Sequence, residues 1–355
     1  MVKNIKPMTN KCAVVLGKGK YKDERQGFKL ENGPRSEFIE IASLTNADII
    51  SYTSAKAVRG GWFGTLFHKK PIYGSVVDFL FKAKEYDRCY VTGEDIGLPL
   101  ALALKMRRWR GKIICVVHNI TPRKARLFKA IGNRYFSFLI VVSKKQKDAL
   151  VDKCGIPPHK IISVFNWVDT DFFKPLDKAP ENDTPIVMAC GAENRDYETL
   201  IKTANYVDAS FQIFASGFFK NSEDISFELP PNIRQMPRVS FEDLKNSYQR
   251  ADVVAVPLNN VDYAAGVTGL VEAMACGKPV VISRTSGIKD YLHAVDPAFQ
   301  VEPGNVTDMA RAINGSLAEV CKKHSSIGKT NRAWALENCA LDLYAKKICT
   351  LLQDY

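Results

Sequence analysis

The stretch GVTGLVEAMACGKPVV, residues 266–281, decides the fold class that the sequence predicts. Leu270, Val271 and Met274 give it an apolar face at helical spacing, and Gly277 followed by Pro279 predicts the helix end. The run that follows, VVIS, has the continuous apolar character of a strand buried on both faces. A loop, a short helix and a buried strand in succession are typical of a parallel sheet covered by helices.

The same alternation of apolar runs and amphipathic stretches extends along all 355 residues. Because a chain of this length exceeds what one hydrophobic core usually organises, we expect two domains. The alternation predicts an α/β fold with two doubly wound, Rossmann-like domains in tandem. Strands are predicted at 12–17, 47–53, 88–93, 112–118, 138–143 and 160–165, and again at 185–191, 210–216, 233–236, 251–257 and 279–283.

A polar segment separates the two predicted domains. KPLDKAPENDTP, residues 174–185, is rich in Pro, Asp and Lys and has one large apolar residue. We therefore expect a first domain over residues 1–173, a linker over 174–184 and a second domain over 185–330. An amphipathic C-terminal helix over 331–355 is expected to pack back on the first domain.

The composition is that of a globular protein, with 46% apolar and 25% charged residues. No apolar run approaches the ~20 residues that span a bilayer, and the first residues lack the apolar core of a signal peptide. These features favour a cytoplasmic location. The nine cysteines show no CxxC or Cys/His spacing, which argues against structural zinc and against a disulfide framework.

Glu272 is the one carboxylate within the opening stretch. It lies about one turn beyond Thr268, on the side of the predicted helix that faces its amino end. Free backbone N–H groups and the helix dipole at that end favour a phosphate, and a carboxylate there can accept hydrogen bonds from a ribose diol. A lone Glu on a helix is more often simply solvated, so the neighbouring segments must decide.

Those segments carry a family resemblance. GVTGLVEAMACGKPVV resembles the carboxyl-domain motif of retaining, nucleotide-sugar-dependent glycosyltransferases of the two-domain GT-B architecture, which include glycogen synthase and lipid mannosyltransferases. Residues 138–175, IVMACGAENRDYETLIKTA and VSFEDLKNSYQRADVVAVP resemble further segments of that family in the same order, with Trp167 replacing the Gly of an Asn-Gly-Val-Asp core. The resemblance implies two domains that face each other across a cleft, with the donor held by the second and the acceptor mainly by the first.

The resemblance also implies roles for individual residues. It assigns Glu272 to the ribose, and Arg195 stands where the family usually has a Lys that neutralises the diphosphate, a task suited to the guanidinium fork. His118, after KIICVVH, matches the histidine near the donor sugar, although an isolated histidine at a strand end is commonly a core residue. The other donor-side positions are Gly266, Val267 and Thr268 at the diphosphate, Gly191 after the first donor-domain strand, and Arg238, Val239 and Ser240 at the base.

Two departures from the family pattern leave a second interpretation open. Ala264 stands where a Glu commonly contacts the donor sugar, with Asp262 close enough to replace it, and Ala192 stands where an Arg usually follows Gly191. With fewer fixed groups for sugar and phosphate, the alternative is a non-catalytic GT-B protein that binds a nucleotide or a partner.

Three residues of the first domain are candidates for acceptor binding. Gly19 lies in the glycine-containing turn GKGKYKDERQG, Asn119 follows His118, and Asp95 lies in GEDIG at a strand end. For Asp95 we favour capping of a helix that begins near Gly97 over contact with an acceptor.

The positive charge of the chain is concentrated in one region. Residues 56–135 contain seventeen Lys or Arg and five Asp or Glu, an excess equal to the net charge of +12 of the whole chain. Aromatic residues interleave with these cations, which favours an anionic membrane surface over a solvated rim around an anionic ligand. No nucleic-acid-binding motif appears. We therefore expect a lipid-linked or membrane-presented acceptor, with a small soluble acceptor as the alternative, and neither a cofactor nor a metal.

Overall fold

The computed structural model describes residues 11–17, 33–67, 69–132, 134–178, 182–215, 229–322 and 326–353. The chain divides into two compact units. Unit 1 contains residues 11–17, Arg35–Val164 and the residues from Tyr344 onward, and unit 2 contains Phe165–Leu343 together with Gly33 and Pro34. Each unit is an α/β fold built on its own parallel sheet, which confirms the predicted fold class.

The sheet of unit 1 has six parallel strands in the order β2-β1-β3-β4-β5-β6. Because β2 lies on one side of β1 and the later strands lie on the other, the strand order reverses between β1 and β3, which makes the sheet doubly wound. The strands are short apolar runs with Val14, Val91 and Leu139 fully buried. Their bounds are Cys12–Val15 (β1), Asp48–Ile50 (β2), Arg88–Val91 (β3), Lys112–Val116 (β4), Phe136–Val141 (β5) and Ile161–Ser163 (β6).

Helices connect these strands, and their ends follow local capping rules. Ser143 accepts a hydrogen bond from the Gln146 amide, and the Gln146 side chain bonds back to the Ser143 amide, so α7 begins with a capping box. The described helices of unit 1 are α1 (Glu37–Thr45), α2 (Tyr52–Arg59), α3 (Gly61–Phe67), α4 (Pro71–Lys82), α5 (Glu94–Met106), α6 (Pro122–Ile131) and α7 (Lys144–Cys154).

The sheet of unit 2 also has six parallel strands, in the order β12-β11-β10-β7-β8-β9. Val280, Val281 and Ile282 are at most 1% exposed, as expected for a strand covered on both faces. The strand order reverses between β7 and β10, which pair through Val187 and Val253. The bounds are Ile186–Cys190 (β7), Ser210–Phe214 (β8), Ile233–Gln235 (β9), Val253–Val256 (β10), Val280–Ser283 (β11) and Gln300–Val301 (β12).

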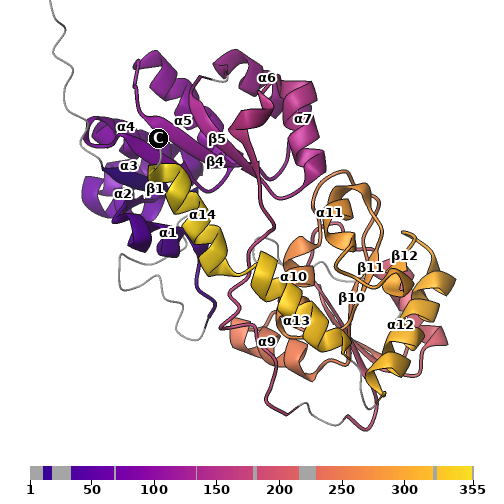
Figure 1. Ribbon diagram of the computed structural model, residues 1–355. Helices are drawn as coiled ribbons and strands as arrows, with labels where there is room; N and C mark the ends of the chain where they lie inside the picture. Colours follow the sequence, from indigo (N-terminus) through magenta and orange to yellow (C-terminus); the bar gives the residue numbers. More distant parts are fainter. Residues whose placement is uncertain are drawn as a thin grey trace, which may run out of the picture. The chain divides into compact units, whose positions relative to one another are not determined.

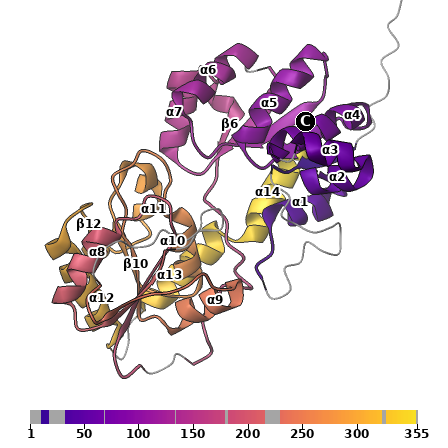
Figure 2. The same cartoon turned by 180° about the vertical axis from the view of Figure 1, so that it is seen from behind.

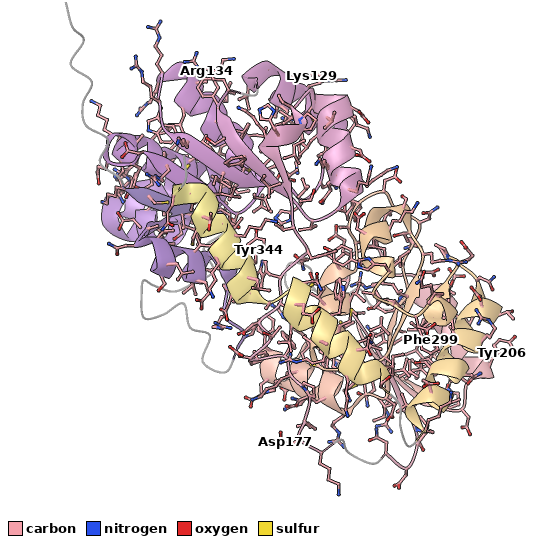
Figure 3. All side chains as sticks on the ribbon, viewed as in Figure 1. Lys129, Arg134, Asp177, Tyr206, Phe299 and Tyr344 are labelled. Atoms are coloured by element: carbon pink, nitrogen blue, oxygen red, sulfur yellow. The ribbon has the colours of Figure 1, made fainter. Side chains whose placement is uncertain are left out.

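Helices flank this second sheet as well (Figure 1). α8 and α12 pack together, as Figure 2 shows from behind, and α10 packs against α13. Figure 3 shows Phe299 within the unit and Tyr206 near its edge, in line with exposed fractions of 6% and 68%. The helices are α8 (Tyr197–Thr203), α9 (Phe241–Arg250), α10 (Val267–Ala275), α11 (Lys289–Leu292), α12 (Val306–Val320) and α13 (Ile327–Asn338).

The boundary between the units differs from the expected one. The segment from Phe165 to Phe173 belongs to unit 2, although we expected the first domain to extend to residue 173. Its aromatic side chains explain the difference. The ring of Phe165 packs edge-on against Tyr291 with centroids 5.1 Å apart, and that of Phe173 against Tyr248 at 5.9 Å. These contacts anchor the segment in the core of unit 2.

The C-terminal segment also differs, because the expected single helix over 331–355 is two helices. Val168 receives a hydrogen bond from Leu341 N (3.0 Å) and donates one to Cys339 O (2.8 Å), so the chain at Ala340 is paired like a strand between α13 and α14 (Leu341–Gln353). The first helix stays with unit 2. The second packs on unit 1, where the hydroxyl groups of Tyr344 and Tyr90 lie 3.1 Å apart.

Candidate active site

The site of unit 2 lies where its strand order reverses, which is the usual ligand position in doubly wound sheets. The loop after β7 and the loop after β10 run side by side there. Asp196 N donates to Pro257 O and Asn259 N donates to Asn194 O, each over 3.1 Å. The two loops therefore form one backbone framework at the carboxyl ends of the strands.

Arg195 folds back over the end of β7. Its Nε donates to Cys190 O and its Nη1 to Glu193 O, both over 2.9 Å. Gly191 has a φ of 104°, and a Cβ there would lie 2.4 Å from Nη2 of Arg195, so the position requires glycine. Among the described residues Nη2 has no hydrogen-bond partner, which leaves one face of the guanidinium able to contact an anion.

The amino end of α10 begins beside the same loops. Its N-cap, Gly266, has a φ of 86°, and a Cβ there would approach a Leu258 methyl group to 2.9 Å. No side chain caps this helix start in the described part of the chain, so its first backbone N–H groups are open to a ligand. Val267 is buried and Thr268 is exposed, with Thr268 Oγ1 3.4 Å from Asn166 Nδ2.

Glu272, one turn into α10, is half-buried and faces these groups. Its Oε2 accepts a 2.9 Å hydrogen bond from the hydroxyl of Tyr248, which is fully buried. Burial raises the pKa of Glu272 to about 7, while the Tyr248 hydrogen bond and the charge of Arg195 oppose the rise. A Cβ on Gly269 would lie 3.3 Å from Cys190 Sγ, 3.5 Å from the Tyr248 hydroxyl and 3.8 Å from Arg195 Nη2, so these groups converge over the helix.

Two further carboxylates flank the position of Ala264, which packs against the core of unit 2. Asp262 accepts a 2.6 Å hydrogen bond from Ser286, and Glu193 accepts one of 2.9 Å from the Tyr263 hydroxyl. Both carboxylates are exposed. Sequence reasoning identified Asp262 but missed Glu193, because its partner Tyr263 lies in a loop seventy residues further along the chain.

The three positions predicted at the base have mixed structural roles. Ser240 is the N-cap of α9, since its hydroxyl accepts from Asp243 N (3.1 Å) and donates to Asp243 Oδ2 (2.7 Å). Val239 packs against the core, and Arg238 is exposed. The Ser240 side chain is therefore engaged within the protein, which leaves backbone groups of this segment for a ligand.

In unit 1, His118 follows β4 and is exposed. Its Nε2 lies 3.0 Å from Thr92 O. Because a carbonyl oxygen can only accept, the neutral imidazole carries its proton on Nε2 and a lone pair on Nδ1. Glu37, the half-buried first residue of α1, interacts electrostatically with this imidazole, and burial raises the pKa of Glu37 to about 7.

Glu94 is a residue that sequence reasoning missed. It is 1% exposed, and its carboxylate accepts from His118 N (2.8 Å), Asn119 N (3.2 Å) and Lys124 Nζ (2.6 Å). The 118–119 backbone is therefore fixed by a buried acid from the end of the neighbouring strand. An acid directly after a strand was visible in GEDIG, but the sequence did not distinguish Glu94 from Asp95.

The predicted acceptor residues have separate outcomes. Asp95 does not cap its helix, because α5 already begins at Glu94 with Gly93 as N-cap, and its carboxylate lies 2.9 Å from Lys124 Nζ. Asn119 is exposed beside His118. Gly19 lies outside the described residues.

Comparisons with known proteins agree with this geometry. Residues 187–319 match the family described as Glycosyl transferases group 1, and residues 52–172 match Glycosyltransferase Family 4. The chain is also similar to the solved structure of Anabaena HepE in complex with UDP, with a TM-score of 0.72 at 17% identity over 97% of this chain and 100% of that one. The chain has the two-domain GT-B glycosyltransferase fold. Sucrose-phosphate synthase from Thermosynechococcus elongatus is similar with a TM-score of 0.66 at 18% identity, over 80% and 78% of the two chains.

The chain is also similar in sequence to curated proteins, including two glycosyltransferases. One is the GDP-mannose-dependent monoacylated alpha-(1-6)-phosphatidylinositol monomannoside mannosyltransferase of Corynebacterium glutamicum, which is 24% identical over 48% of either chain. The other is the D-inositol 3-phosphate glycosyltransferase of Mycobacteroides abscessus, 26% identical over 50% of this chain and 44% of that one. The matched region thus spans less than half the length of these relatives.

Two wider searches of the described residues were negative. No described helix combines the length and the apolar character that crossing a bilayer requires. His, Cys, Asp and Glu side chains do not gather in metal-binding groups of three or more anywhere in the described ranges.

Proposed function

We propose that this GT-B chain is a retaining glycosyltransferase that moves a sugar from a nucleoside diphosphate donor to an acceptor. The observation that carries the proposal is the convergence of Gly191, Arg195, Glu272 and the open start of α10 at the strand reversal of unit 2. A guanidinium and a helix start suit a diphosphate, and a carboxylate one turn away suits a ribose diol. The UDP in the HepE complex is a ligand of this chemical class.

In the proposed reaction, the bond between the anomeric carbon and the diphosphate oxygen breaks, and a bond to the acceptor oxygen forms on the same face of the sugar. The acceptor proton passes to the departing diphosphate. Arg195 and the 266–268 backbone would stabilise the charge that develops on the diphosphate. We infer that these groups stabilise that negative charge without a resident metal, which predicts that EDTA leaves the activity unchanged.

His118 would act on the donor sugar in this scheme. Its Nδ1 lone pair can accept a hydrogen bond from a sugar hydroxyl, while Thr92 and Glu94 hold its ring and its backbone in place. Asn119 is adjacent and exposed, and Asp95 is a second exposed polar group on unit 1. We assign these two residues to the acceptor.

The acceptor that we propose is lipid-linked or presented at a membrane. The C. glutamicum relative is named for a phosphatidylinositol mannoside. In addition, unit 1 has exposed apolar side chains on adjacent helices, together with exposed cations that would attract anionic headgroups. The basic face, as we name this surface, comprises Trp62, Leu66, Tyr73, Phe81 and Met106 with Lys56, Lys69, Lys70, Lys105, Arg107 and Arg108.

Nucleotide binding tests the proposed function. A panel of nucleotide sugars is screened by thermal shift, and the best ligand is then assayed for slow hydrolysis with release of the nucleoside diphosphate. We expect one member to raise the melting temperature of the wild type, with a much smaller rise for E272Q. The matched control is E242Q, which changes an exposed glutamate on α9.

Two results would contradict this proposal. If no nucleotide sugar stabilises the wild type, the alternative of a partner-binding GT-B protein, which Ala192 and Ala264 favour, takes its place. If a nucleotide sugar binds but is never hydrolysed or transferred, the chain binds a nucleotide without being an enzyme.

A further inference from the structure

Tyr248 occupies an unusual position for a buried tyrosine. It lies in α9, is 0% exposed, and its ring packs edge-on against Phe173. Its hydroxyl lies 2.9 Å from Glu272 Oε2 and 2.7 Å from Cys190 Sγ. The hydroxyl therefore joins a strand, β7, to a helix, α10, through two polar contacts in an otherwise apolar interior.

The positions of the protons on Glu272, Tyr248 and Cys190 follow from which atoms can donate. When Glu272 is ionised, Oε2 can only accept, so the single phenol proton of Tyr248 points toward it. The Cys190 thiol must then donate to the Tyr248 oxygen. Burial raises the pKa of Cys190 to about 11, so its proton is present at neutral pH.

We propose that Tyr248 is a positioning residue of the donor site, which orients the Glu272 carboxylate so that it accepts hydrogen bonds from a vicinal diol. Among the described residues, Tyr248 is the one hydrogen-bond donor to that carboxylate, and it uses only Oε2. Oε1 is left for the ligand. The proposal rests on the proposed function, because the diol is that of the nucleotide ribose.

Four titratable or charged groups interact electrostatically with Glu272. They are Tyr248 from α9, Cys190 from β7, Arg195 from the loop after β7, and Cys276 at the end of α10 itself. Of these, the Tyr248 hydroxyl and the Arg195 charge lower the pKa of Glu272, against the larger effect of burial. Removing the hydroxyl should raise that pKa further, so less of the accepting form would be present at pH 7.

The test is the pH dependence of nucleotide affinity in Y248F, which keeps the ring and its packing. Dissociation constants for UDP and GDP are measured by calorimetry between pH 6 and pH 9. We expect Y248F to bind about tenfold more weakly than the wild type at pH 7, since a hydrogen bond to a charged group is worth about 1.5 kcal/mol or more. The deficit should narrow toward pH 9, because Glu272 then ionises in Y248F as well, whereas a purely structural defect would give the same deficit at every pH.

Four further variants separate this effect from others. E272Q should bind weakly at every pH and gives the baseline for titration of the nucleotide itself. Y90F loses a fully buried tyrosine hydroxyl in unit 1 and should bind like the wild type. C190S keeps a proton donor to Tyr248 and should keep the wild-type profile, whereas C190A should shift the profile in the direction of Y248F.

The outcomes distinguish the two proposals. If the wild type binds nucleotide and E272Q weakens it, but Y248F follows the wild-type profile, the positioning role is wrong and the proposed function stands. If the wild type binds neither nucleotide, both proposals fail. Should Y248F not fold, equal profiles for C190A and C190S would overturn the positioning role.

Discussion

Glu272 combines two demands that oppose each other. Its half-buried carboxylate is held where a diol can reach it, but burial also makes its charge costly, which is why its pKa rises to about 7. A residue placed for binding in this way should lower the stability of the empty protein.

The first prediction follows from that conflict. Because the pKa of Glu272 is higher in the folded than in the unfolded state, the folded protein holds more protons between about pH 4.5 and pH 7, and stability falls as the pH rises through this window. Glutamine does not titrate, so E272Q should be more stable than the wild type at pH 8, by on the order of 2 kcal/mol. Thermal melting without ligand at pH 5 and pH 8 measures the difference.

The control for this prediction is again E242Q, which changes an exposed side chain and should alter stability by less than about 0.5 kcal/mol. If E272Q melts at a lower temperature than the wild type at pH 8, the ionised carboxylate does not destabilise the folded protein.

At the residue scale, the sequence identified positions that belong to a local motif and missed those that act across the chain. Gly191, Arg195 and Glu272 were predicted from motif segments, and the structure brings them together. Tyr248 and Glu94 were not predicted. Each bonds to a group at least twenty-four residues away, and neither stands in a pattern that distinguishes it from an ordinary core tyrosine or a helix-starting acid.

At the element scale, the loop after β7 depends on one glycine. G191A would require a left-handed conformation and would place a methyl group 2.4 Å from Arg195 Nη2. We expect it to displace the guanidinium, to weaken nucleoside diphosphate binding at least tenfold and to lower stability. Calorimetric titration with UDP or GDP checks the affinity, and melting checks the stability.

G155A is the matched control. Gly155 ends α7 with a φ of 69°, but a Cβ there would meet nothing within 4 Å. It should lose about 1 kcal/mol for the left-handed backbone and leave nucleotide affinity unchanged. If G191A and G155A bind the nucleotide with equal affinity, Gly191 is not part of the nucleotide site.

The turn between β4 and α6 gives a second prediction at this scale. In E94Q, an amide replaces the carboxylate that accepts from two backbone N–H groups and Lys124, so at least one buried donor loses its partner. We expect a loss of about 1–3 kcal/mol in stability and a slower hydrolysis of the donor, because the His118 backbone is no longer fixed. Denaturant unfolding and the hydrolysis assay measure the two effects.

Glu319, which pairs with Lys322 on the surface of α12, supplies the comparison. E319Q should change stability by less than about 0.5 kcal/mol. If E94Q behaves like E319Q, the buried acid does not organise this turn.

The elements themselves were predicted unevenly. Most of the described strands lie within or close to the predicted ranges, because apolar β-branched runs are a strong local signal, but the two-residue strand β12 was not predicted. Helices α2, α3 and α4 were not predicted, since their region contains Gly60, Gly61, Gly64 and Gly74, and glycine is a poor helix former. Val168 interrupts the C-terminal helix through a pairing that only the folded chain brings about.

At the scale of the whole molecule, the two-domain α/β architecture was predictable because the alternation of strand and helix repeats twice. The boundary between the units was not predictable, because it depends on the packing of Phe165 and Phe173 in the core of unit 2 and not on local composition. The net positive charge of unit 1 was predictable from the sequence. Which of its cations and apolar side chains are exposed was not, and the structure shows it.

The basic face predicts binding to anionic vesicles. Phosphatidylglycerol-containing liposomes should carry the protein upward in a flotation gradient at low salt, and binding should weaken as salt screens the cations. W62S/L66S should reduce binding, because both side chains are more than half exposed and apolar. Purely zwitterionic liposomes should not bind.

Y206S is the control, since Tyr206 is an equally exposed aromatic residue of unit 2, outside the basic face. Failure of the wild type to float with anionic liposomes at low salt would remove the membrane from the proposed function and favour a soluble acceptor.

The passage of the chain from unit 2 back to unit 1 near Tyr344 has a consequence for biosynthesis. Tyr90 on β3 meets its buried partner, Tyr344, only after the whole of Phe165–Leu343 has been made. During synthesis on the ribosome, unit 1 therefore cannot complete its folding until α14 has been made, although domains generally fold in the order of their synthesis. Unit 2, which is continuous over that stretch, can finish first, so a nascent chain halted before α14 should resist proteases in its second half before its first.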